Sequence, residues 1–129
     1  WSTCSNGVSW PVQCAVAALY TPEGVQQVRQ LVDFYMENAQ ILRQAVAQQG
    51  LPVWGGQHAP YVWGECPHGL ESWETFDLLL KQAQVVVTPG AGFGAHGARF
   101  FRISAFNSRA NVVEAGRRLA VLTRSPAAV

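Results

Sequence analysis

The sequence has 129 residues, of which 49% are hydrophobic and only 13% are charged. This composition supplies enough apolar side chain to bury a core and excludes an intrinsically disordered chain. The net charge is +1, and the basic residues are scattered along the chain. We therefore expect neither nucleic acid nor a membrane surface as a partner.

The cysteines and the first residue bear on the cellular context. Cys4, Cys14 and Cys66 are odd in number and form no C-x-x-C pair, which favours a reduced compartment over a disulfide framework. No apolar run approaches the length of about 18 residues that a membrane-spanning helix needs. The sequence begins at Trp1 and its one methionine is Met36, so we expect the natural start and any targeting segment to lie upstream.

The first half of the chain predicts two helices. Pro11 is typical of a first helical turn, and the apolar stretch after it predicts a short buried helix. Thr21, Pro22 and Glu23 then combine a capping hydroxyl, a first-turn proline and an acid near the positive end of the helix dipole. Apolar residues follow at steps of three and four, which predicts a helix of about 25 residues with one apolar face, ended by Gly50.

The second half predicts shorter elements. They are strands at 51–54 and 61–63, a helix at 72–83 capped by Ser72, strands at 85–87 and 100–105, and a closing helix from Ser108. In the 72–83 helix we expect Trp73, Phe76, Leu79 and Leu80 on the buried side. A long helix followed by β-β-α-β-β-α predicts an α+β fold, or a three-layer arrangement of the α/β type.

The glycine-rich segment from Gly92 to Gly97 matches the pattern G-x-G-x-x-G. A dinucleotide site needs a helix to open inside that pattern, so that backbone N–H groups face the pyrophosphate. Here the segment runs into a strand pattern, which argues against a nucleotide site. We predict instead a loop that needs the backbone freedom of glycine. Such a loop is compatible with a position beside a cleft.

Arg102 is the strongest candidate for a functional residue. Strand alternation places Arg102 and Ser104 on one face, with Phe101, Ile103 and Ala105 on the other. A charge in so apolar a strand either pairs with an acid of the protein or binds an anionic ligand, since an unpaired buried charge is costly. A guanidinium binds a carboxylate through two parallel hydrogen bonds, which suits the α-carboxylate of an amino acid. Spacing alone leaves both alternatives open.

The other reactive side chains give weaker patterns. His58, His68 and His96 have no metal-ligand spacing with any cysteine, and Cys66–Pro–His68 is too tight for the usual zinc sites. A cysteine–histidine nucleophile has no acid or amide partner in the pattern. Lys81 is the only lysine and ends an amphipathic helix, where a solvated lysine is the ordinary case. No metal site is predicted.

Several segments together resemble the LL-diaminopimelate aminotransferases, which are fold-type I enzymes dependent on pyridoxal 5′-phosphate (PLP). The resemblance runs in unbroken order from about residue 3 to residue 120, and its specificity lies in the order and spacing of the segments. They are SNGVSWP at 5–11 with Gln13, YTPEG at 20–24, YMENA at 35–39, APYVW at 59–63, Ser72-Trp73, TPGAGFG at 88–94, FRISAF at 101–106 and RANV at 109–112.

The resemblance implies a homodimeric transaminase of lysine biosynthesis that exchanges an amino group between LL-2,6-diaminopimelate and 2-oxoglutarate. It implies the C-terminal part of such an enzyme: residues 1–20 end the cofactor domain, 21–50 form a long connecting helix and 51–129 form the small domain. The Schiff-base lysine would lie upstream of Trp1. Arg102 matches the arginine that binds the substrate α-carboxylate, and Asn6 matches an asparagine that reaches into the partner subunit's site. The implied compartment is the bacterial cytoplasm or the chloroplast stroma.

Departures from the family pattern leave two alternatives. Cys4 and Ser5 replace a lysine and a phenylalanine, His58 replaces an asparagine, and the pair at 98–99 replaces Glu-Gly. An aminotransferase of different amino-acid specificity would keep Arg102 and change such positions. The absence of the cofactor lysine from this chain also permits a non-catalytic interaction or regulatory module.

Overall fold

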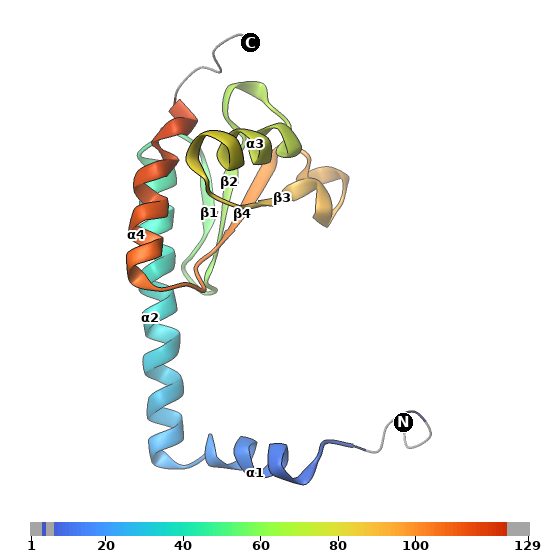
Figure 1. The fold of residues 1–129 in the computed structure, drawn as a ribbon, viewed down its shortest axis with the longest axis vertical. Helices are drawn as coiled ribbons and strands as arrows, with labels where there is room; N and C mark the ends of the chain where they lie inside the picture. Colours follow the sequence, from blue (N-terminus) through green and yellow to red (C-terminus); the bar gives the residue numbers. More distant parts are fainter. Residues whose placement is uncertain (1–3, 5–6, 124–129) are drawn as a thin grey trace. The chain divides into compact units, whose positions relative to one another are not determined.

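The computed structural model describes residue 4 and residues 7–123. It divides into two compact units, one up to Phe34 and the other from Tyr35 onward. In the described residues, no helix is both long and apolar enough to cross a bilayer. Figure 1 shows the elements in chain order.

The first unit contains helix α1, Trp10–Ala18, and the beginning of helix α2, Pro22–Ala47. The predicted cap is confirmed, since the Thr21 hydroxyl accepts a hydrogen bond from the Gly24 N–H at 3.1 Å. The prediction that the first helix is buried is wrong, because α1 contains no buried residue. Its sequence is apolar on all sides, but the described residues place nothing over it.

Helix α2 confirms the predicted long helix and ends three residues before Gly50, which has φ +74°. Its apolar stripe is not buried along its whole length. In the first unit Val28, Leu31 and Val32 are exposed, whereas in the second unit Leu42 and Val46 lie in the core. The apolar face of the predicted helix is therefore buried only in the C-terminal part of the helix.

The second unit contains a four-stranded antiparallel sheet in the order β1-β2-β4-β3. The strands are β1 Val53–Gly55, β2 Tyr61–Glu65, β3 Thr88–Pro89 and β4 Phe100–Ser104. The remaining helices are α3 Ser72–Leu78, which continues as a π turn at Leu79–Ala83, and α4 Arg109–Arg118. Short 3₁₀ turns occupy Pro67–Gly69, Gly90–Phe93, Ala95–Gly97 and Leu119–Thr123. The predicted order β-β-α-β-β-α and the α+β class are confirmed.

One face of the sheet carries the core. Val62 on β2 and Phe101 and Ile103 on β4 are buried against residues of α2, α3 and α4. Helix α4 lies beside the C-terminal half of α2 (Figure 1), because Gly116 lets the Ala45 side chain approach closely. The opposite face holds the alternate residues of β2 and β4, which stay partly exposed.

Three local predictions in the second unit are wrong. No strand forms at 85–87, because Gln84 adopts a left-handed conformation with φ 55° and the Val85 N–H donates back to Leu79 O. Ser72 is the first residue of α3 rather than its cap; the Glu71 N–H before it donates to Glu74 Oε2 at 2.8 Å. Trp73 and Leu80 are exposed, whereas Leu79 is fully buried.

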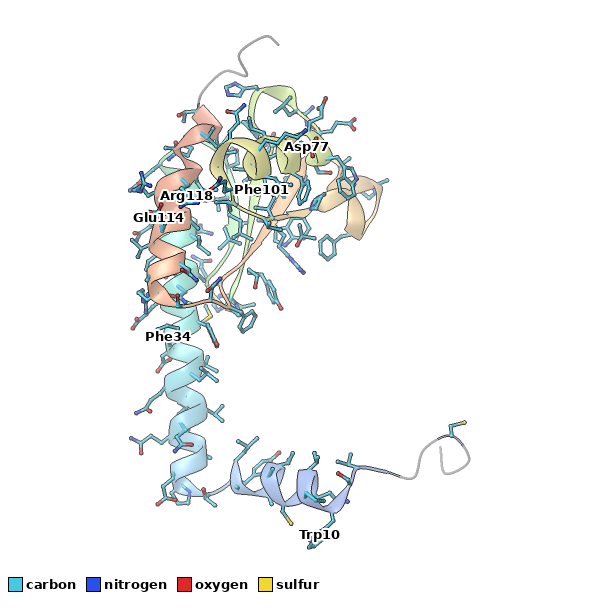
Figure 2. The ribbon with its side chains drawn as sticks, viewed as in Figure 1. Trp10, Phe34, Asp77, Phe101, Glu114 and Arg118 are labelled. Carbon is cyan, nitrogen blue, oxygen red and sulfur yellow. The ribbon has the colours of Figure 1, made fainter. Side chains whose placement is uncertain are left out.

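Helix α4 begins as predicted, since the Ser108 hydroxyl accepts from the Asn111 N–H at 3.3 Å. At its other end Arg117 and Arg118 both donate to the Glu114 carboxylate at 2.7–2.8 Å. Figure 2 shows Glu114 and Arg118 together on this helix. These hydrogen bonds, first those from Arg117 and then those from Arg118, lower the pKa of Glu114 from 4.5 to about 2.

This cluster predicts a pH-dependent contribution to stability. Because folding lowers the pKa of Glu114, its contribution is complete above pH 4.5 and disappears as the pH falls to about 2. We expect the acid-induced loss of helicity between these pH values to be smaller in Glu114→Gln than in the wild type. Circular dichroism along a pH titration measures it, and equal acid transitions would contradict the prediction.

Candidate functional site

The partly exposed face of the sheet brings Arg102 together with aromatic side chains. Arg102 on β4 lies opposite Trp63 on β2, and Ser104 lies opposite Tyr61. Cross-strand partners project to the same side of a sheet, so these four side chains share one face. The predicted alternation on β4 is confirmed, since Phe101 and Ile103 are buried on the other face.

Arg102 contacts two aromatic rings. Its guanidinium carbon lies 4.7 Å from the centre of the Tyr61 ring and 4.6 Å from that of Phe93. Contacts of this kind stabilise by about 0.5–2 kcal/mol each, and more as the cation is removed from water. The rings attract the charge but do not accept the strong in-plane hydrogen bonds that a carboxylate accepts.

No acid of the protein neutralises Arg102 among the described residues. The ion pairs of that part of the chain involve Lys81, Arg109, Arg117 and Arg118. The Nε atom of Arg102 is buried and has no hydrogen-bond partner there. Of the two alternatives that spacing left open, an internal ion pair is not seen in the described part of the chain, and an arginine that awaits an anion agrees with the geometry.

The glycine-rich segment holds Phe93 beside Arg102. Gly90 and Gly97 touch through their backbones, so a Cβ atom at Gly90 would lie 2.3 Å from Gly97 O and 2.5 Å from Phe100 O. The Ser72 hydroxyl accepts from the Ala91 N–H at 3.3 Å and ties the segment to α3. The loop prediction is confirmed: the segment forms 3₁₀ turns and enters β4, and no α-helix opens within it to face a nucleotide.

Sequence reasoning did not identify Tyr61 or Phe93 as partners of Arg102. Phe93 lies in a loop, where its side chain has no periodic pattern to place it. Its exposed fraction of 52% and its contact with Trp63 at 5.2 Å between ring centres emerge only from the folded chain. An aromatic residue between the glycines of a close-packed loop is the one feature of the sequence that could have indicated it.

The remaining reactive residues form no second site within 7–123. His68 Nε2 lies 3.1 Å from the carbonyl oxygen of Leu122, and Cys66 is buried, so the cysteine–histidine nucleophile is not formed. Burial raises the pKa of the Cys66 thiol. In the described residues, no three histidine, cysteine or acidic side chains gather as metal ligands.

Lys81 is an ordinary surface lysine, as predicted. Its ammonium group pairs with Asp77 at 2.7 Å, and its side chain is 70% exposed. A lysine that attaches a cofactor needs a desolvated or cationic setting that lowers its pKa. Lys81 has neither. The other predicted site residue, Asn6, lies outside the described residues.

One recess in the second unit lies away from Arg102. Its volume is about 370 Å³, and it lies where the chain at Gln84–Val86 separates from the end of β4, beside Asn111 and Arg118 of α4. Arg102 does not line it. The candidate site is therefore an open face of the sheet with one unneutralised cation, and the described residues do not enclose it.

A family model for aminotransferase class I and II matches residues 3–119. The chain belongs to the class I and II aminotransferases. It is 55% identical over 118 residues to an LL-diaminopimelate aminotransferase of Prochlorococcus marinus and 49% identical over 121 residues to one of Methanosphaera stadtmanae. These alignments cover 92% and 94% of the chain.

Solved aminotransferase structures contain the same arrangement. The L,L-diaminopimelate aminotransferase from Chlamydomonas reinhardtii matches 91% of this chain with a TM-score of 0.87 and 44% identity. An aromatic aminotransferase from Pyrococcus horikoshii matches 82% with a TM-score of 0.75 and 28% identity. The chain spans 29% of the length of each of these two structures and of the curated relatives. This aminotransferase chain therefore corresponds to less than a third of such a protein.

Proposed function

We propose that this chain is part of a PLP-dependent LL-diaminopimelate:2-oxoglutarate aminotransferase, and that Arg102 binds the α-carboxylate of its amino-acid and oxo-acid substrates. The substrate assignment rests on identities of 44–55% to proteins with that name, over nearly the whole of this chain. The role of Arg102 rests on its own surroundings.

One observation carries the role: Arg102 is a partly buried guanidinium without a neutralising acid among the described residues. A planar fork of N–H donors matches the two oxygens of a carboxylate, and the pair is stronger in a site that excludes water. Two such hydrogen bonds fix the orientation of an amino acid as well as its position. Arg102 would thus hold one end of the substrate while the amino group reacts at the other.

The described residues do not fit the covalent attachment of PLP. Lys81, the only lysine, is exposed and paired with Asp77. When bound, PLP receives the amino group and spreads the negative charge that develops at the substrate α-carbon. What this chain contributes to that chemistry is the binding and orientation of the carboxylate. The lysine that carries the cofactor belongs to the part of such a protein that lies outside this sequence.

We further propose that the complete protein is a homodimer of lysine biosynthesis, in which Asn6 reaches into the partner subunit's site. In this proposal residues 1–20 end a cofactor domain, 21–50 form a connecting helix and 51–129 form a small domain. A cytoplasmic or stromal location accords with three cysteines that form no C-x-x-C pair.

An amino-donor panel on the complete protein tests this function. With PLP and 2-oxoglutarate present, we expect glutamate to form from LL-diaminopimelate with kcat/KM at least about tenfold higher than from aspartate, lysine or phenylalanine. The isolated 129-residue chain is the control, and we expect it to give no glutamate and no long-wavelength absorbance with PLP. A higher kcat/KM for another donor would overturn the substrate, and no turnover of any donor by the complete protein would favour a non-catalytic module.

A further inference from the structure

Arg102 is oriented by rings rather than by acids. In most proteins a partly buried arginine is held by a carboxylate or by carbonyl oxygens, which occupy its N–H donors. Here the guanidinium carbon lies 4.6–4.7 Å from the centres of the Phe93 and Tyr61 rings, and the described residues form no ion pair with it. The faces of the rings attract the cation without accepting the in-plane hydrogen bonds that a carboxylate would accept.

Phe93 is positioned more firmly than an exposed loop residue needs to be. The backbone contact of Gly90 with Gly97 closes the loop at its base. The Ser72 hydroxyl holds Ala91 from α3, and the Trp63 ring packs edge-on against Phe93 at 5.2 Å. An exposed aromatic ring contributes little to the core, so the fixed loop and the contact with Trp63 indicate another role for Phe93.

Tyr61, on strand β2, is also supported by a neighbouring aromatic ring. Its ring meets Phe106 at 5.6 Å between centres, and Phe106 meets Tyr35 of α2 at 4.8 Å. The Tyr61 side chain is partly exposed, with 37% of the residue accessible. Both rings that contact Arg102 are thus supported by a further aromatic side chain.

We propose that Phe93 and Tyr61 are positioning residues, which hold the Arg102 guanidinium in the orientation that receives the substrate carboxylate. The proposal rests on the proposed role of Arg102. An acid at either position would hold the cation more strongly, but it would compete with the substrate for the same N–H groups. The rings restrict the rotamers of Arg102 before binding, so less side-chain entropy is lost when the carboxylate arrives.

The test uses the complete protein and glutarate, a dicarboxylate with neither an amino nor a keto group, as a competitive inhibitor against glutamate. We expect Phe93→Leu to raise the Ki of glutarate and the KM of glutamate by the same factor, about fivefold, and to change kcat less than about twofold. Phe93→Tyr keeps a ring and is expected to keep both constants. Trp73→Leu, which removes an exposed ring of α3, is the matched control and is expected to change neither.

A double-mutant cycle separates positioning from a merely structural role. If Phe93 acts through Arg102, Phe93→Leu has little effect on the Ki of glutarate once Arg102 is lysine, so the two effects are not additive. Equal effects of Phe93→Leu in both backgrounds would overturn the inference, as would equal losses in Phe93→Leu and Phe93→Tyr. Tyr61→Phe against Tyr61→Leu repeats the comparison at the second ring.

The outcomes distinguish the two proposals. If Arg102→Lys weakens glutarate binding and Phe93→Leu and Tyr61→Leu do not, the positioning role fails and the carboxylate role stands. If Arg102→Lys itself leaves the Ki unchanged, the carboxylate role fails and the positioning role with it. Cofactor absorbance and the thermal midpoint, measured for each variant, show that the compared proteins are folded and loaded alike.

Discussion

Arg102→Lys in the complete protein is expected to lower kcat/KM for every amino donor by about 100-fold. Lysine keeps the charge but loses the planar fork, so it offers one point of attachment in place of two parallel hydrogen bonds. It also loses the flat cation that lies 4.6 Å and 4.7 Å from the two ring centres. The substrate carboxylate would then be bound without a defined orientation.

The measurement is steady-state kinetics with at least three amino donors, because a residue that binds the shared α-carboxylate affects them all. Arg117→Lys is the matched control: Arg117 lies on α4, is 73% exposed and pairs with Glu114, so we expect its kcat/KM to stay within about twofold of the wild type. If Arg102→Lys also stayed within twofold for every donor, Arg102 would not be the carboxylate ligand.

The elements that were predicted correctly are those that local chemistry decides. The hydroxyl and proline at Thr21-Pro22 mark the start of α2, and the Ser108 hydroxyl marks the start of α4, because each satisfies backbone N–H groups within its own turn. Strand alternation is also a local property, because successive side chains of a strand project to opposite faces whatever surrounds them. It correctly places Arg102 on one face of β4 and Phe101 and Ile103 on the other.

The elements that were predicted wrongly depend on tertiary context. Three consecutive valines at 85–87 favour a strand, yet the left-handed turn at Gln84 directs them away from regular pairing. Trp73 was expected on the buried side of its helix, but 62% of it is exposed, although its ring meets that of Phe76 on the same helix. Apolar character predicts burial only where a neighbouring element supplies the covering surface.

Arg102 was identified from the sequence, but the aromatic residues that contact it, Phe93 and Tyr61, were not. Arg102 stands out in the sequence because a charge interrupts an apolar strand. The ring of Phe93 reaches it through a loop whose path depends on the backbone contact between Gly90 and Gly97, and no periodicity encodes such a path. Tyr61 is a diagonal neighbour of Arg102 across the ladder, which becomes visible only once the register of β2 with β4 is known.

Phe101→Ala is expected to cause the largest loss of stability, about 3–5 kcal/mol. Phe101 is fully buried, and its ring fills the space that Gly64 leaves on the neighbouring strand: a Cβ atom at Gly64 would lie 2.5 Å from Phe101 Cζ. Truncation removes the ring and leaves a cavity that glycine cannot fill. Figure 2 places Phe101 in the body of the second unit.

Urea denaturation of the chain measures this loss as a change in the free energy of unfolding. Trp73→Ala also removes an aromatic ring, but one that is 62% exposed, so we expect a loss of about 1 kcal/mol or less. Equal losses in the two variants would contradict the assignment of Phe101 to the core.

Phe101 and Arg102 are consecutive on β4 and project to opposite faces of the sheet. The Phe101 ring fixes β4 in the core and thereby also determines the position of the Arg102 guanidinium. We therefore expect Phe101→Ala to weaken glutarate binding in the complete protein under conditions where the protein remains folded.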